Sequence, residues 1–169
     1  SLNTLTLALR KDASEAREEA TRATRQYRDL QTTTEEYARQ VEIGAQLKGR
    51  DFVMTGITET GKDSDRSSRI SKLKVCGNLI ENAISPKGPR YIYLRVKGPD
   101  GILLTNPDQG VFNAAGEQLV YSALREIDYQ GSEIEFCIFF GGVGFSRGVY
   151  TAELFTSDGK IGATDILLR

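Results

Sequence analysis

The 169-residue sequence contains no histidine and no tryptophan, and it has only two cysteines. Without histidine, the chain lacks the commonest general base, the usual activator of a serine or cysteine nucleophile, and the commonest metal ligand. Carboxylate pairs remain, such as Glu126 with Asp128 and Glu133 with Glu135, but pairs two residues apart on a strand ordinarily belong to a solvated face. We therefore predict that the protein is not an enzyme and has no catalytic residue, cofactor or metal site.

The sequence also lacks an excess of one charge and a long apolar run. It has 22 basic and 23 acidic residues, a net charge of -1. Because the two signs are interleaved, we expect no nucleic-acid partner. No segment approaches the roughly 18 apolar residues of a membrane-spanning helix, and no secretory signal stands at the amino end. We expect membrane attachment only through a segment missing from this chain.

Two segments are similar to ligand-binding motifs but do not match them. Asp63, Asp65 and Ser67 have the alternate spacing of a calcium loop, yet Lys74 occupies the place of the bidentate glutamate. The glycine-rich segment 141–148 has strand-like sequence on both sides, whereas a phosphate-binding loop leads into a helix. We interpret the first segment as a solvated connection and the second as a hairpin loop.

A heptad pattern occupies the first part of the chain. Small and apolar residues recur in steps that alternate between four and three, the spacing of a coiled-coil seam. A helix of about 45 residues within 1–48 would be roughly 65 Å long and would need a partner to cover this seam, most simply another copy of the chain. We predict a coiled-coil helix that forms a homo-oligomer or clasps a protein partner through the seam residues Leu9, Ala13, Ala16, Ala20, Ala23, Tyr27, Leu30, Thr34, Tyr37 and Val41.

The helical segment leaves two questions open. Thr32 and Glu35 have the spacing of a capping box, so a helical hairpin is an alternative to one continuous helix, although the heptad phase runs through them unbroken. Asp12 and Arg17 have the spacing for one pairing between parallel chains, but other seam-flanking positions are uncharged. The flanking charges therefore do not predict which partner the seam selects, and the sequence predicts neither the number of copies nor the orientation of the helices. Lys48 followed by Gly49 predicts the end of the helix.

From residue 49 to residue 169 the pattern changes to that of β-strands. Short runs of alternating apolar and polar residues are separated by turn-forming segments, which favours a two-sheet antiparallel sandwich over a small barrel. Segment 58–68 is polar and is expected to be a loose connection. We expect the main strands at 70–80, 91–96, 102–105, 118–129, 133–140, 149–156 and 161–168.

Two resemblances accompany this pattern. Gly148, Tyr150 and Leu154 open a strand that, with the turn 157–160 and the run 161–168, resembles the last hairpin of immunoglobulin-like and fibronectin-like domains. That resemblance implies an immunoglobulin-like sandwich with the tyrosine near an edge corner. Segment 86–104, with its motif residues Lys87, Gly88, Pro89, Tyr91, Tyr93, Arg95 and Gly98 to Gly101, resembles one in uncharacterised proteins of Gram-negative gut bacteria. Those proteins join a membrane anchor, a coiled coil and a β-sandwich, which implies the periplasm or cell envelope; a cytoplasmic location is the alternative.

The two cysteines lie on the polar faces of their predicted strands. Cys76 shares its face with Lys74 and Cys137 with Glu135, and in an immunoglobulin-like order these strands would be neighbours. Directly opposed residues have Cα atoms about 4.5 to 5.5 Å apart, within reach of a disulfide. A disulfide and two isolated buried thiols are both compatible with the sequence.

We carry two hypotheses for function. The first is a non-enzymatic scaffold whose helix oligomerises or clasps a partner and whose sandwich presents a binding surface. The second is a carbohydrate-recognising accessory module, in which Tyr91, Tyr93 and Arg95 form a possible binding face and Tyr121 and Tyr129 add stacking surfaces. An open, flat tyrosine face would favour the second hypothesis.

Overall fold

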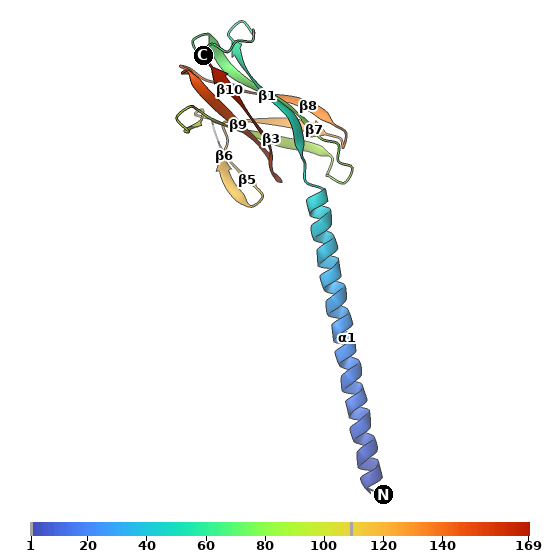
Figure 1. Cartoon of the computed structure of the whole chain (residues 1–169). Helices are drawn as coiled ribbons and strands as arrows, with labels where there is room; N and C mark the ends of the chain where they lie inside the picture. The colour runs from blue at the N-terminus through green and yellow to red at the C-terminus, as the bar shows by residue number, and fades with distance from the viewer. Residues whose placement is uncertain (1, 109) are drawn as a thin grey trace. The chain divides into compact units, whose positions relative to one another are not determined.

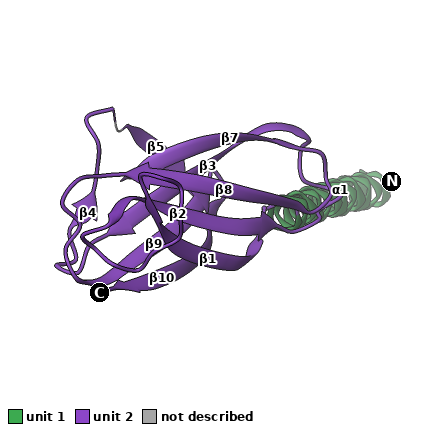
Figure 2. Ribbon diagram, turned by 90° about the horizontal axis from the view of Figure 1, so that it is seen from above, with its two compact units in different colours: residues 1–44 green, residues 45–169 purple. Residues whose placement is uncertain are grey.

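The computed structural model describes residues 2–108 and 110–169, in which one helix is followed by ten β-strands (Figure 1). The chain divides into two compact units, one ending at Gly44 and the other comprising Ala45–Arg169 (Figure 2). We call the second the β unit. The chain thus has an α+β fold with segregated parts, a helix followed by an antiparallel β-sandwich, as the change of period predicts.

Helix α1, Leu2–Gly44, is uninterrupted. Thr32 to Glu35 continue it, and the Thr34 hydroxyl donates to the carbonyl oxygen of Leu30 at 2.8 Å, as hydroxyls inside a helix do. The helical-hairpin alternative is therefore wrong. The helix ends at Gly44, before the expected end at Lys48, because the next residues belong to the β unit. Leu47 is 1% exposed and lies in the β unit's core.

Two main sheets build the sandwich of the β unit. The first has the order β1-β2-β8, and the second has the order β10-β9-β3-β4, with β7 also pairing with β3. All these pairings are antiparallel. The strands are β1 Gly49–Thr58, β2 Ile70–Leu79, β3 Gly88–Lys97, β4 Leu103–Leu104, β7 Ala123–Tyr129, β8 Ile134–Gly141, β9 Gly148–Thr156 and β10 Gly159–Leu168.

The order of the seven longer strands is that of an immunoglobulin-like Greek key. Counting only these strands, the first, second and fifth form one sheet, and the third, fourth, sixth and seventh form the other. A constant-type immunoglobulin domain differs only in pairing its fourth strand with the fifth. Tyr150, near the start of the sixth strand, is buried, and its hydroxyl accepts from the Ser146 N–H at 2.9 Å and donates to the Ser146 carbonyl at 3.1 Å. This contact is the tyrosine corner that the resemblance implies.

Side-chain alternation explains why the sheets pack face to face. Successive strand residues point to opposite faces, so Leu73 and Val75 of β2 face inward with Ile92 and Leu94 of β3. All four are 0% exposed and belong to one core cluster. Lys74 and Tyr93, which lie between them, belong to the outer faces.

A bulge in β1 adds Phe52 to this core. The register shifts between Arg50 and Val53, and Asp51 has φ 57°. The Phe52 ring occupies a slot that glycines leave open: a Cβ on Gly77 or Gly162 would lie 2.3 Å or 2.1 Å from a ring atom. The slot requires glycine because no larger residue fits beside the ring.

A hairpin that the sequence analysis did not identify precedes β7. It consists of β5, Val111–Ala114, and β6, Glu117–Val120, joined by Ala115 and Gly116, which both have positive φ. The expected strand 118–129 is therefore two strands, interrupted at Tyr121 and the buried Ser122.

Candidate functional site

The seam of α1 is uncovered. Every described residue of the helix is exposed, including the large seam residues Tyr27, Leu30 and Tyr37, each at least 65% exposed. Apolar surface that is exposed to solvent along a regular helix favours association with another apolar surface. No helix in residues 2–108 and 110–169 has the length and apolar character needed to cross a membrane.

Cys76 and Cys137 are joined by a disulfide. They are directly opposed in the pairing of β2 with β8, and their Cα atoms are 4.1 Å apart. Both are half-buried on the outer face of the three-stranded sheet, the face that their parity predicts. Exposed Val53 is paired with Cys76, and exposed Phe139 receives the Lys72 ammonium 4.8 Å from its ring centroid. The alternative interpretation was two isolated buried thiols. The structure instead has both cysteines in one covalent bond.

The Tyr91, Tyr93 and Arg95 face is not open. Tyr93 stacks on Phe112 of the β5–β6 hairpin, with ring centroids 4.1 Å apart and planes 6° apart. The Arg95 guanidinium donates to the Val120 carbonyl of the same hairpin at 2.6 Å. Tyr91 is the exposed member of the three, at 47%. The hairpin therefore covers most of this face and turns it into a second, smaller core with Phe155.

The remaining tyrosines do not restore a flat stacking surface. Tyr129 is 0% exposed and its hydroxyl donates to the Ile80 carbonyl at 2.8 Å. Tyr121 is half-buried and lies 5.8 Å from Tyr93 between ring centroids. Burial, with a contribution from the nearby Tyr91 and Tyr121, raises the pKa of Tyr93. The surface that carbohydrate stacking requires is thus largely closed.

The polar connection 59–69 is better ordered than expected. The Ser64 N–H donates to the Gly56 carbonyl at 2.9 Å, and Ser67 and Arg169 are joined by a backbone bond of 2.8 Å. The Asp65 carboxylate accepts two bonds from the Arg169 guanidinium, at 2.9 and 3.0 Å. These bonds, with a smaller contribution from the charge of Arg169, hold the pKa of Asp65 below its usual value. The sequence gives no signal for this contact, because its partners are far apart along the chain.

The carboxylate pairs considered for acid–base chemistry are on the surface. Glu126 and Asp128 are exposed on β7, and Glu133 forms a bidentate pair with Arg50, with both N–O distances 2.7 Å. Within residues 2–108 and 110–169 no group of three or more potential metal ligands is present.

The comparison with family models decides the family. A model for a domain of unknown function, DUF8428, matches residues 50–169. The chain belongs to the DUF8428 family. The matched segment begins in β1 and continues to the last residue, so the DUF8428 domain coincides with nearly all of the β unit, and α1 lies outside it. No curated protein matches the sequence.

Solved structures with a likeness to the DUF8428 sandwich have varied functions. The alkylpurine DNA glycosylase AlkC of Pseudomonas fluorescens, bound to DNA with an abasic site analog, is 11% identical with a TM-score of 0.44, over 75% of this chain and 31% of that one. The β-glucosidase of Kluyveromyces marxianus is 10% identical with a TM-score of 0.40, over 74% and 14%. The cupredoxin domain of amoB from Nitrosocaldus yellowstonii is 15% identical with a TM-score of 0.33, over 72% and 85%. The chain thus spans less than a third of the first two proteins, and likenesses this low carry no functional argument.

Proposed function

We propose that this chain is a non-enzymatic interaction module, in which α1 self-associates through its heptad seam and the DUF8428 sandwich presents a binding surface. The observation that carries the proposal is the uncovered seam: α1 has 43 residues and none of them is buried. A helix with an apolar stripe is stabilised mainly by covering that stripe, since propensity alone leaves isolated helices marginal.

The partner that fits the seam best is a second copy in parallel orientation. Asp12 and Arg17 occupy the two positions that flank the seam, five residues apart, so in a parallel pair Asp12 of each copy faces Arg17 of the other. The pairing forms twice in a dimer. Ala13, Ala16, Ala20 and Ala23 allow close approach of the helices, and the larger apolar residues on either side bury more surface.

The packing of the β unit supports the second part of the proposal, that the sandwich presents a binding surface. Its core is complete, so its loops and outer faces are free to differ without loss of the fold. We do not adopt the carbohydrate-recognition hypothesis, because the β5–β6 hairpin covers the face that would stack on sugars.

The Cys76–Cys137 disulfide supports a location in an oxidising compartment, as part of this proposal. Disulfides persist in the periplasm and at the cell surface and are rare in the cytoplasm. The periplasm or cell envelope is therefore the location we propose, and a cytoplasmic location is the alternative.

The test is the mass of the full chain in solution, measured by sedimentation equilibrium over a range of concentrations. We expect an oligomer for the wild type and a monomer for Ala16→Asp with Ala23→Asp, which would place unpaired charges in the seam. The matched control is Ser14→Asp with Thr21→Asp. It adds the same charges at the same seven-residue separation on a different face of α1, and it should leave the mass unchanged.

A wild-type chain that stays monomeric at high concentration would refute self-association. Equal dissociation of the seam variant and its control would show that charge, rather than the seam, governs association. The amide chemical shifts of the β unit should be the same in all three proteins, because the changes lie outside it.

A further inference from the structure

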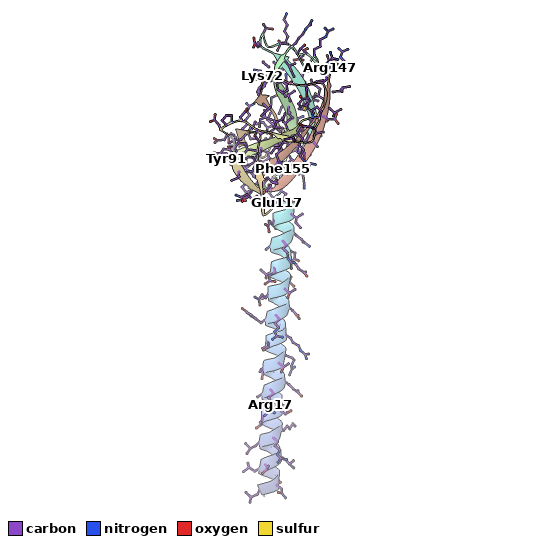
Figure 3. All side chains as sticks on the ribbon, turned by 90° about the vertical axis from the view of Figure 1, so that its left-hand side faces the viewer. Arg17, Lys72, Tyr91, Glu117, Arg147 and Phe155 are labelled. Atoms are coloured by element: carbon purple, nitrogen blue, oxygen red, sulfur yellow. A yellow bond between two sulfur atoms is a disulfide. The ribbon has the colours of Figure 1, made fainter. Side chains whose placement is uncertain are left out.

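Three arginines from distant segments converge at one end of the β unit. Arg66 comes from the β1–β2 connection, Arg147 from the β8–β9 loop and Arg169 from the end of β10. With Ser67 and Ser68 they line a hollow of about 410 Å³. Figure 3 shows Arg147 at this end, toward which Lys72 also lies.

The β9–β10 register brings two of these arginines together. Leu168 is paired with Gly148, so the next residue on each strand places Arg169 beside Arg147. Like charges that line one hollow repel one another. The convergence is therefore unfavourable unless a negative group lies between the guanidinium groups.

The negative side chain at the hollow neutralises only part of this charge. Asp65 binds Arg169 through both carboxylate oxygens. Among the described residues, no hydrogen bond or ion pair engages the guanidinium groups of Arg66 and Arg147, and both side chains are exposed. Three arginines and one aspartate leave a side-chain charge of +2 (3 − 1) around the hollow.

The backbone holds the arginines in place. The Ser67 N–H donates to the Arg169 carbonyl at 2.8 Å, and the Arg169 N–H donates to the Asp65 carbonyl at 2.7 Å, which ties the β1–β2 connection to β10. The buried Tyr150 hydroxyl holds Ser146, the residue before Arg147, through the tyrosine corner. These bonds fix the backbone beneath the three side chains, which lowers the entropy cost of bringing their guanidinium groups to one ligand.

We propose that this hollow binds a tetrahedral oxyanion, a phosphate or sulfate group. Guanidinium groups bind such anions through charge-assisted hydrogen bonds, and the Ser67 and Ser68 hydroxyls add neutral donors. Donors from three segments suit the several oxygens of a tetrahedral anion better than the two oxygens of a carboxylate. The loops at the end of an immunoglobulin-like sandwich are a frequent place for binding. This inference names the ligand class of the proposed binding surface and rests on that proposal for its role.

The test is a nuclear magnetic resonance titration of the ¹⁵N-labelled full chain with sodium phosphate, sodium sulfate, sodium acetate and sodium chloride at equal ionic strength. We expect saturable shifts of residues 65–68, 147 and 169 with phosphate and sulfate. Arg66→Gln and Arg147→Gln should each weaken phosphate binding about tenfold or more, because each removes a charge-assisted donor. Arg69→Gln is the control: it removes the same charge from the same connection but lines a neighbouring hollow.

Shifts that do not saturate, or that chloride reproduces, would overturn the proposal. So would equal weakening by Arg69→Gln, because binding would then follow net charge rather than the hollow. Acetate binding as tightly as phosphate would overturn the tetrahedral assignment. The same titration on Ala16→Asp with Ala23→Asp separates the two proposals: saturable binding by a monomeric chain supports the site independently of association, and a wild-type oligomer without binding refutes only the site.

Discussion

The two units of this chain differ in how far their large apolar side chains are exposed to solvent. In α1 the large apolar residues lie on the surface, with Leu30 66% exposed, whereas in the β unit Leu73, Ile92 and Leu154 are 0% exposed. Two sheets can cover each other, but a single helix has no second layer. The stability of the β unit is therefore internal, and that of α1 depends on a partner. Changes in one unit should leave the other unaffected.

Removal of the disulfide should have the largest effect on the β unit. Cys76→Ala with Cys137→Ala opens a loop with a sequence separation of 61, which is expected to lower the free energy of unfolding by about 4 kcal/mol in the chain-entropy model. Guanidinium denaturation followed by tyrosine fluorescence measures this loss, since the chain has no tryptophan. The association of α1 should not change.

Titration of free thiols tests the disulfide itself. Denatured, unreduced protein that has first been exposed to an oxidant should show no free thiol. Two free thiols per chain would show that the disulfide does not form. The proposal of an oxidising compartment would then lose its support.

Leu154→Ala should lower the free energy of unfolding by about 2 to 5 kcal/mol, because it leaves a cavity among fully buried neighbours. The matched control is Leu167→Ala in the adjacent strand, where the side chain is 60% exposed and the loss should be small. Equal losses in the two variants would contradict the assignment of the inner and outer faces.

Gly162→Ala should cost about 1 to 3 kcal/mol through overpacking, since the new methyl group would contact the Phe52 ring. Gly141→Ala is the control, because a Cβ there would meet nothing within 4 Å. The same denaturation curves measure both. If Gly162→Ala is as stable as Gly141→Ala, the Phe52 slot is not as tight as the structure indicates.

The smallest expected effect concerns the orientation of the helices. Arg17→Asp should weaken association by about 0.2 to 1 kcal/mol for each lost pairing, and Asp12→Arg in addition should restore it by exchanging the two charges. Sedimentation equilibrium at low salt measures the change. In an antiparallel arrangement these residues would not face each other, and the second substitution would give no rescue.

Much of the fold was predictable because local periodicity reports which side chains share a face. Ala16, Ala20 and Ala23 repeat with the period of a helix, and Ile92, Leu94 and Val96 repeat with the period of a strand. The parity of Cys76 and Cys137 likewise placed them on one outer face. The β5–β6 hairpin was missed because its strands have only four residues each, too few to show alternation clearly.

Local patterns in the sequence are enough to predict the helical and β segments, most of the longer strands and the faces of those strands, because these follow from the directions in which neighbouring side chains point. The closure of the β5–β6 hairpin over Tyr93, and the meeting of Arg66, Arg147 and Arg169 at one hollow, could not be predicted without the three-dimensional structure. Contacts of this kind join residues far apart in the chain. They depend on which strands become neighbours when the two sheets pack, and no local pattern carries that information.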